Sequence, residues 1–425
     1  MSYAFEPVRE FCRSKALEIV AEHEDRRQVT LNLVASENLM SPAALRMLSS
    51  DFAHRYCIPP ANERPKEIWD YPNQTFTRAI EAKAKELACR LFDGKVADVR
   101  PLSGNNIVGI LLSSLAEAGD ALLSVPPSAG GHFATAPVAE RLGLDHAGLP
   151  YDNEQGTVDL DATRKLSRTL RPKLLYLDAS MILFPYPVAQ LREIFGEECI
   201  IVYDASHCFG LIGGGRFQAP LLEGADIISG STHKTMFGPQ KGLIVAREAG
   251  KTAETIQNAI TPLFVSNSHV HHIASLAVAL EELHEFGRAY AAQVIQNAKA
   301  LGRSLAKEGV SMMFPNKDFT ESHQLLCLLK AGTDVPGEVK RLEQAGLHLN
   351  GINAPFSGLP GLRIGVAELT RRGFRTEAMA EVARCMADVL LSRRPLADVR
   401  MQVRDLSQAH QHLKYGFDEA GKPLV

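Results

Sequence analysis

Six short apolar runs, separated by stretches with helical spacing, constrain the fold of this chain more than any other feature. They lie between residues 97 and 248 and read ADVRPLSG, ALLSVPP, KLLYLDAS, CIIVYDASHC, ADIISGST and KGLIVARE. Because the runs are continuous rather than alternating, they are typical of strands that are buried on both faces. The pattern predicts a mostly parallel α/β sheet with helices on both faces over about residues 50–285.

Helical periodicity marks both flanks of this region. Residues 1–30 read as one charged amphipathic helix, because Val8, Phe11 and Leu17 recur at helical spacing. A second helix is predicted over 73–92, with Asn73 as its N-cap and Gly94 after its end. The first helix is expected to form an arm that packs on a neighbouring subunit.

The C-terminal part combines long helices with short strands. A helical stretch at 275–309 is followed by strand candidates at 323–331, 346–350 and 361–365 and by a helix at 375–394. The predicted division is an N-terminal helical arm (1–35), a large α/β domain (36–285), a smaller α+β C-terminal domain (286–400) and a tail (401–425).

Composition and charge exclude several classes of protein. The chain has 425 residues and a formal net charge of -3, without a long basic block, so nucleic acid is not an expected partner. No apolar run approaches the roughly 20 residues of a membrane-spanning helix, and the N-terminus lacks a signal pattern. The seven cysteines are widely spaced without a C-x-x-C pair, which is typical of reduced thiols. We therefore expect a cytoplasmic enzyme that uses neither a membrane nor a disulfide framework.

A histidine cluster at His269, His271 and His272 is the one candidate for a metal site. Neighbouring acids or thiols with ligand spacing are missing, so these are expected to be surface or interface histidines and no metal is predicted.

Polar residues follow several of the predicted strands, where ligands of open α/β sheets bind. Ser103, Gly104 and Asn105 open a helix whose free N–H groups suit a phosphate. After the next run, paired glycines precede His132, an imidazole that is able to stack on a flat ring. Singly, such a Ser-Gly pair is more often a helix cap than a phosphate site.

Two further strand ends supply the remaining groups. Asp204 and His207 follow CIIVY, and Thr232, His233 and Lys234 follow ADIISG. A strand-end Asp is more often an N-cap, and a lysine in a turn is usually solvated. Together, however, these residues are the parts needed for pyridoxal phosphate, because a lysine forms its Schiff base and a carboxylate keeps its pyridine nitrogen protonated.

The chain also resembles a known family. The stretches LNLVASEN, SGNN, SAGGH, YDASHCFGLI, STHKTMFGPQKGLI and GLRIGVAELTRRGF are similar to serine hydroxymethyltransferase, a fold-type I pyridoxal phosphate enzyme, in order across about residues 10–390. The resemblance implies a mostly parallel large-domain sheet of the seven-stranded type. It also implies a homodimer with active sites at the interface.

Carried over to this chain, the resemblance implies a role for each site residue. Lys234 is the Schiff-base lysine, Asp204 pairs with the pyridinium nitrogen and His132 stacks on the ring. The remaining cofactor contacts are Ser180 and His207 near the phenolic oxygen, Ser103, Gly104, Asn105 and His233 toward the phosphate, Thr232 beside the Schiff base, and Ser266 from the neighbouring subunit. The substrate contacts are Ser36, Tyr56 and Arg363, of which the guanidinium matches a carboxylate bidentately.

The chain departs from the family after Tyr56. The family typically reads Tyr-x-Glu-Gly-Tyr-Pro and then Arg-Tyr-Tyr-Gly-Gly, whereas this chain has Ile58 at the glutamate position. Pro60 replaces a tyrosine, and Pro65 with Lys66 replaces the Tyr-Tyr pair that follows Arg64. The glutamate handles protons in hydroxymethyl transfer, and isoleucine neither donates nor accepts one. The folate-dependent reaction is therefore not expected, unless Glu63, Glu67 or Asp70 substitutes in a rearranged loop.

Two other segments differ as well. In the family, a glycine-rich loop reaches the neighbouring subunit's phosphate with its backbone N–H groups. This chain has Ser266, Asn267 and Ser268 near those positions. Side-chain donors are able to replace the backbone N–H groups. The loop NGINAPFSGLPG before Arg363 is shorter than the family's folate-contacting region. Both differences indicate another co-substrate.

The predicted function is pyridoxal-phosphate-dependent chemistry at Cα of a small amino acid of the glycine, serine or threonine type. The reaction is expected to be an aldol or transaldol step with an aldehyde or another small electrophile, without tetrahydrofolate. A transaminase, decarboxylase or racemase on the same scaffold stays open, as does a folate-dependent enzyme with a rearranged acid. A binding protein without turnover is disfavoured, because Lys234, Asp204, His132 and Arg363 are all present.

Overall fold

A mixed sheet of seven strands forms the centre of the computed structural model, which describes residues 14–59 and 71–425. All neighbouring strands are parallel except β10, which runs antiparallel to both of its partners. The predicted mostly parallel α/β sheet is confirmed. In spatial order the strands are β2 (Val96–Asp98), β10 (Gly242–Ala246), β9 (Ile227–Ser231), β8 (Ile200–Asp204), β7 (Leu174–Leu177), β3 (Ala121–Ser124) and β4 (Asp145–Gly148).

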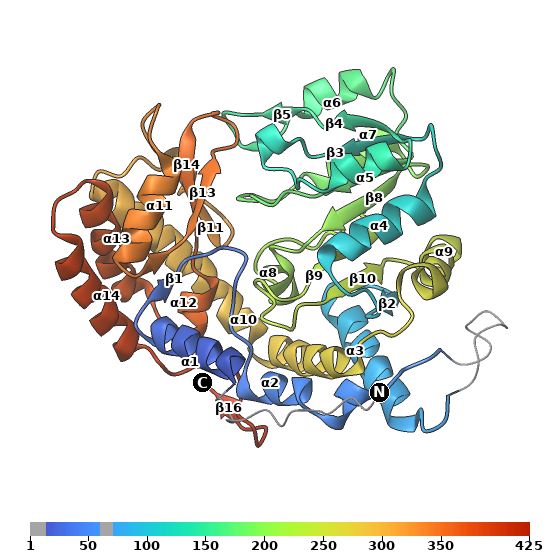
Figure 1. Cartoon of the computed structure of the whole chain (residues 1–425). Helices are drawn as coiled ribbons and strands as arrows, with labels where there is room; N and C mark the ends of the chain where they lie inside the picture. Colours follow the sequence, from blue (N-terminus) through green and yellow to red (C-terminus); the bar gives the residue numbers. More distant parts are fainter. Residues whose placement is uncertain (1–13, 60–70) are drawn as a thin grey trace, which may run out of the picture.

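Helices cover both faces of this sheet because successive strand residues point to opposite sides. Leu175 and Leu177 of β7 belong to one core cluster, which also holds residues of α3 (Thr75–Phe92) and α10 (Val270–Lys307). Leu174 and Tyr176 belong to a second cluster, with α4 (Gly104–Leu115) and α9 (Lys251–Ala259) on the other face (Figure 1).

Shorter elements complete this half of the molecule. They are α2 (Pro42–Leu48), η1 (Asp51–His54), η3 (Pro127–Ala129), α5 (Thr135–Arg141), β5 (Tyr151–Asp152), β6 (Thr157–Val158), α6 (Leu160–Leu166), α7 (Val188–Phe195), α8 (Phe209–Gly213) and η4 (Ile260–Phe264).

The start of α3 differs from its prediction. Asn73 is not the N-cap, because the helix begins at Thr75 and Gln74 is the cap residue. Asn73 has a φ of 59°, a left-handed conformation that asparagine tolerates, so it turns the chain before the helix starts. Gly94 does follow the end of the helix, and its N–H donates to the Cys89 carbonyl at 3.1 Å.

The C-terminal part builds a smaller α+β unit. Its antiparallel sheet has the order β11 (Gln324–Leu328), β14 (Pro360–Gly365), β13 (Asn350–Asn353). The strand predicted at 346–350 forms β12 (Leu347–His348), which pairs with β1 (Leu31–Asn32) instead of joining that sheet. The helices of this unit are η5 (Pro315–Lys317), α11 (Val335–Gln344), α12 (Ala367–Arg371), α13 (Thr376–Leu390) and α14 (Leu396–Ala409).

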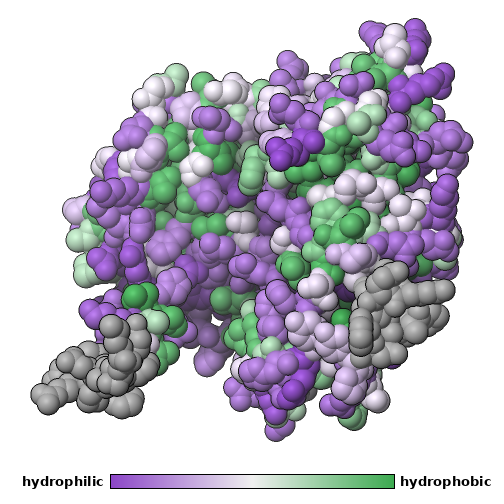
Figure 2. All heavy atoms as spheres, turned by 45° about the vertical axis from the view of Figure 1, so that its right-hand side comes forward, coloured by the Kyte–Doolittle hydropathy of each residue, from purple (hydrophilic) through white to green (hydrophobic). Residues whose placement is uncertain are grey.

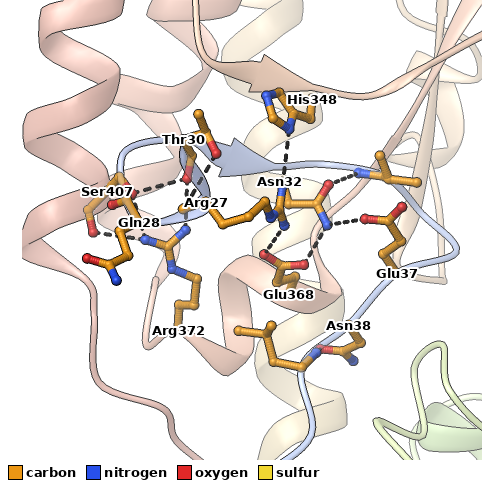
Figure 3. A network of polar contacts seen from close by, with 12 residues as sticks. Arg27, Gln28, Thr30, Asn32, Glu37, Asn38, His348, Glu368, Arg372 and Ser407 are labelled. Carbon is orange, nitrogen blue, oxygen red and sulfur yellow. Dashed lines mark hydrogen bonds and ion pairs between the residues drawn. The ribbon is translucent and has the colours of Figure 1, made fainter. Parts of the chain in front are cut away.

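The N-terminal segment is fixed to this smaller unit by polar contacts (Figure 3). Helix α1 (Lys15–Gln28) has no buried residue, and the first part of the predicted helix, with Val8 and Phe11, lies outside the described residues. Arg27 pairs with Glu368 at 2.8 Å, and the Asn32 amide donates to the same carboxylate at 2.5 Å. Residues 27–32 are therefore held by buried hydrogen bonds rather than by the helix itself.

Two predicted domain boundaries fall inside helices. The boundary at 285 lies within α10, a single helix of 38 residues, and the boundary at 400 lies within α14. Buried residues continue along α10 from Val270 to Leu305, so the apolar stripe gives no break there. After α14 the chain ends in a hairpin of β15 (Gly416–Phe417) and β16 (Pro423–Leu424). The division into domains stays a prediction.

Hydrophilic and hydrophobic residues are intermixed over the face shown in Figure 2. Across residues 14–59 and 71–425, no helix is long and apolar enough to cross a bilayer. The same part of the chain contains no cluster of His, Cys, Asp and Glu side chains suited to a metal ion.

Candidate active site

A cavity of about 240 Å³ opens beyond the C-terminal ends of β7, β8 and β9, next to the start of α4. This is the edge at which open α/β sheets bind ligands. Its lining contains most of the residues predicted from the sequence. The lining residues are Ser103, Gly104, Asn105, Val108, His132, Asp178, Ala179, Ser180, Asp204, Ser206, His207, Ser231, His233 and Lys234.

The start of α4 offers backbone donors to the cavity. Ser103 is the N-cap, and its Oγ accepts a hydrogen bond from the Asn106 N–H at 3.1 Å. The N–H groups of Gly104 and Asn105 belong to the first turn, which has no partner within the helix. Together with the helix dipole they suit a phosphate group.

Asp204 is held by a turn that the sequence analysis did not single out. The Ser206 N–H donates to Asp204 Oδ1 at 2.8 Å, and the Ser231 N–H donates to Ser206 Oγ at 2.9 Å. Gly230, with φ of 145°, makes this contact possible, because a Cβ there would lie 2.5 Å from Ser206 Oγ. Ser206 and Ser231 lie in DASH and SGST, two stretches that the sequence places at predicted strand ends. Their position after a strand was therefore the signal that could have identified them.

His132 is fixed by the neighbouring strand end. The backbone N–H of His132 donates to the Asp178 carbonyl at 3.0 Å, and the ring Nδ1 accepts from the Ala134 N–H at 3.3 Å. Burial lowers the pKa of His132, an effect that nearby Asp204 opposes, so the neutral ring is favoured. A neutral imidazole in this position is suited to stacking on a flat ring.

Asp178 is a second carboxyl group in the cavity lining, and the sequence analysis missed it. Its oxygens accept from the Val125 N–H at 3.1 Å and from the Thr135 hydroxyl at 2.5 Å. Burial raises the pKa of Asp178 to about 8. Asp178 stands two positions before Ser180 in KLLYLDAS. Its closeness to this predicted site residue was the signal in the sequence that could have identified it.

Lys234 lies among neutral imidazoles. Burial lowers the pKa of its amine to about 8, although the negative charge of Asp204 works in the opposite direction. Burial, followed by the charge of Lys234, also lowers the pKa of His233 to about 4 and that of His207 well below the ordinary range. A lysine whose amine loses its proton this readily is activated as a nucleophile.

Arg363 approaches the cavity from β14 of the smaller unit. Its Nη1 donates to the Ser180 carbonyl at 3.4 Å and its Nη2 to Asn350 Oδ1 at 3.2 Å. The structure thus brings Arg363 to a residue that lines the cavity. Burial lowers the pKa of this guanidinium from its usual range.

Ser36 does not line the cavity. The preceding residue, Ala35, is connected to the cavity through His323. His323 Nε2 lies 3.0 Å from the Ala35 carbonyl and therefore donates to it. The His323 ring stacks on His207, with 5.6 Å between the ring centroids. His323 was missed by the sequence analysis, and no local motif marks it.

Three other predicted residues do not line the cavity of the single chain. The Thr232 hydroxyl is buried and donates to the Pro239 carbonyl at 2.6 Å. Tyr56 is 45% exposed and stacks on Tyr71, and Ser266 is exposed. Their predicted contacts with cofactor or substrate stay predictions.

Several polar atoms around the cavity are buried without a hydrogen-bond partner among residues 14–59 and 71–425. They are His207 Nδ1, Ser231 Oγ, His233 Nδ1 and Arg363 Nε. Buried polar atoms are nearly always satisfied, so unpaired ones at a cavity point to a polar ligand. Donors at a helix start, a strand-end carboxylate and a buried lysine fit pyridoxal phosphate.

Comparison with known proteins agrees with this site. The family described as Serine hydroxymethyltransferase matches residues 12–386. The chain belongs to the serine hydroxymethyltransferase family. Serine hydroxymethyltransferase of Thermococcus kodakarensis is 38% identical over 99% of both chains, and that of Archaeoglobus fulgidus is 38% identical over 96% of this chain and 93% of the relative.

A solved structure extends the comparison to the fold. L-threonine transaldolase from Pseudomonas fluorescens, in its internal aldimine state, superposes with a TM-score of 0.91 and 30% identity, covering 96% of this chain and 94% of that one. Membership of the serine hydroxymethyltransferase family confirms the fold-type I architecture and pyridoxal 5'-phosphate as the cofactor. The chain is a pyridoxal-phosphate-dependent transferase or aldolase that acts at Cα of small amino acids.

Proposed function

We propose that this enzyme makes and breaks a C–C bond at Cα of a small amino acid by aldol or transaldol chemistry, without tetrahydrofolate. The observation that carries the proposal is Ile58, which stands at the position of the family's proton-handling glutamate. The residue is 4% exposed. Its N–H donates to Gln74 Oε1 at 2.9 Å and its carbonyl accepts from Arg78 Nε at 3.2 Å. A packed aliphatic side chain in this place cannot move a proton.

The likeness to L-threonine transaldolase supports the same choice, since that relative covers almost the whole chain. The acids that were considered as substitutes, Glu63, Glu67 and Asp70, lie outside the described residues, as do Pro60, Arg64, Pro65 and Lys66. Among the described residues, the proposal thus rests on Ile58. It requires that the electrophile is an aldehyde and not a folate.

Each site residue has a separate role in the proposed reaction. When bound, the cofactor withdraws electrons from Cα of the substrate. Lys234 holds the cofactor, and Arg363 with Ser36 orients the substrate carboxylate. The proton that leaves the substrate's β-hydroxyl as the Cα–Cβ bond breaks is returned to the oxygen of the incoming aldehyde when the new bond forms. The cofactor contacts are assigned to Asp204 at the pyridine nitrogen, His132 on the ring, Ser180 and His207 near the phenolic oxygen, Thr232 beside Lys234, and Ser103, Gly104, Asn105 and His233 at the phosphate.

We assign Tyr56 and Ser266 to the active site of a partner subunit in a homodimer. Both are exposed in the single chain, which is what residues that complete a neighbouring site require. This arrangement agrees with the family, whose active sites lie at the subunit interface.

The reaction is tested by supplying the purified enzyme with L-threonine and an aromatic aldehyde, with and without tetrahydrofolate. Acetaldehyde and a new β-hydroxy amino acid are expected in equal amounts, at a rate that does not depend on tetrahydrofolate. Lys234→Ala is the inactive control. Product formation that requires tetrahydrofolate contradicts the proposal, and a keto acid, amine or epimer as the main product supports the transaminase, decarboxylase or racemase alternatives.

A further inference from the structure

Lys241 is a buried lysine that the proposed reaction does not use. Burial lowers the pKa of its amine to about 7, although the charges of Asp98 and Glu81 act in the opposite direction. The residue is 1% exposed and does not line the cavity. Its Nζ donates to the carbonyls of Ser268 at 2.7 Å, Pro101 at 3.3 Å and Arg100 at 3.4 Å. A lysine ammonium has three N–H donors, so backbone carbonyls account for all of them.

These carbonyls belong to segments that carry predicted phosphate contacts. Arg100 and Pro101 lie in the turn between β2 and Ser103, the N-cap of α4. Ser268 lies between Ser266 and the start of α10 at Val270. The ammonium therefore joins the phosphate cradle of this subunit to the segment that is expected to reach the partner's phosphate.

The main chain of Lys241 adds a third segment. Its carbonyl accepts from the Thr232 N–H at 3.0 Å, two residues before Lys234, and the next N–H, of Gly242, donates to the Pro101 carbonyl at 3.1 Å. Lys241 and the adjoining peptide thus connect three segments. They are the turn at Arg100 and Pro101, the loop from Thr232 to Lys234, and the segment of Ser268 before α10.

Burying an ammonium is costly unless hydrogen bonds and nearby charges compensate for the lost water. An apolar side chain of similar length would avoid that cost and still fill the space. It would, however, leave the buried carbonyls of Arg100 and Ser268 without this partner. The amine, with its N–H donors, is therefore best explained by the alignment of the three carbonyls.

We infer that Lys241 is a positioning residue for the cofactor phosphate. Its ammonium holds the turn before Ser103 against the segment of Ser266 and Ser268, so that the first-turn N–H groups of α4 are aligned before the cofactor binds. This inference rests on the pyridoxal phosphate site and not on the reaction proposed above. A failure in cofactor binding and a failure in product identity are therefore separate results.

The inference is tested with Lys241→Ala in the apo form of the full chain. The dissociation constant for pyridoxal phosphate, measured by absorbance titration, is expected to rise about tenfold or more, because three buried carbonyls lose a hydrogen-bond donor. Ammonium or ethylammonium chloride is expected to restore the affinity by filling the space among the three carbonyls. Tetramethylammonium chloride, which lacks N–H donors, is expected to have no effect at equal ionic strength.

Lys251→Ala is the matched control, because Lys251 is an exposed lysine at the start of nearby α9. It is expected to bind the cofactor as tightly as the unaltered enzyme. Unchanged cofactor affinity of Lys241→Ala overturns the inference. So does a loss of affinity that neither ammonium nor ethylammonium reverses, because the N–H donors would then not be the positioning element.

A second pair of variants covers the case in which Lys241→Ala does not fold. Lys241→Arg keeps the charge and the donors and is expected to bind pyridoxal phosphate within about threefold of the unaltered enzyme. Lys241→Met keeps the length alone and is expected to bind about tenfold more weakly. Equal affinities of these two variants overturn the inference.

Discussion

At the scale of single residues, burial determines the protonation state of the groups that surround the cavity. The amine of Lys234 and the imidazoles of His207 and His233 all have lowered pKa values, chiefly because water is excluded from the charged form. The neutral forms are the ones that attack an aldehyde or pack against a ring. The same exclusion of water raises the pKa of Asp178, so a second carboxyl group beside Asp204 adds less negative charge than its formula indicates.

The lowered pKa of Lys234 predicts how cofactor capture by the apo enzyme depends on pH. The amine attacks the aldehyde only when neutral, so rising pH increases the reactive fraction until the pH exceeds the pKa of about 8. The capture rate, followed by stopped-flow absorbance, is expected to rise about tenfold between about pH 6 and pH 7 and to level off above about pH 8. Lys234→Ala is expected to show no covalent capture at any pH. A rate that still climbs at pH 10, as for an ordinary lysine, would contradict this assignment.

The residues that sequence reasoning found are those with a recognisable neighbour in the chain. Lys234, Asp204 and His132 stand next to strand ends and glycines, and these mark positions at a ligand-binding edge. His323 was not predicted, because its link to the site is a ring contact with His207 over more than a hundred residues of chain. Asp178 was not predicted either, because a buried Asp after a strand has the same local pattern as a helix cap.

At the scale of elements, helix starts stabilise the fold, and one of them forms the proposed phosphate site. Ser103 caps α4 at the cavity, and Asp159 caps α6 in the same way, with its carboxylate accepting from the Ala162 N–H at 2.9 Å. Asp159 does not line the cavity. The two caps are thus similar in form and differ in what lies beyond them.

This pair predicts separable effects on stability and on cofactor binding. Ser103→Ala and Asp159→Ala are each expected to lower the unfolding free energy of the apo enzyme by about 1 kcal/mol, the usual contribution of an N-cap. Only Ser103→Ala is expected to weaken pyridoxal phosphate binding as well. Urea unfolding gives the first quantity and absorbance titration the second. Equal cofactor affinity in both variants would show that the Ser103 hydroxyl acts only as a cap.

The strands were predictable to the extent that their burial is uniform. Each of the six apolar runs contains or overlaps a strand of the central sheet, whereas β4 was not predicted because its residues are partly or fully exposed. The antiparallel direction of β10 has no counterpart in its apolar composition, since a strand buried on both faces has the same composition in either direction. The pairing of β12 with β1 depends on contacts distant in the chain and could not be seen locally.

At the scale of the whole molecule, the N-terminal segment is joined to the smaller unit through two ion pairs that differ in burial. Arg27 pairs with Glu368, whose side chain is 5% exposed, whereas Arg26 pairs with Glu343, whose side chain is 50% exposed. Glu368 also accepts from Asn32, as Figure 3 shows. The buried pair and its network are therefore expected to hold the segment in place.

Neutralising each glutamate is predicted to separate the two contributions. Glu368→Gln is expected to lower the unfolding free energy by about 1–3 kcal/mol, because it removes the charged acceptor of buried donors. Glu343→Gln, at the solvent-exposed pair, is expected to change it by less than about 1 kcal/mol. Both are measured by urea unfolding at a fixed cofactor concentration. Similar small changes in the two variants would mean that the network does not fix the segment.

Ile58 has a consequence for how enzymes of this kind diversify. It lies between η1 and α3, outside the central sheet, whereas most cavity residues stand at the ends of strands that also form the core. Selection acting on the segment around Ile58 is therefore expected to exchange one electrophile for another at a folding cost that is confined to the packing around that residue, which is 4% exposed. Substitutions at the strand ends face two selective pressures at once, so the cofactor is expected to be inherited more strictly than the reaction.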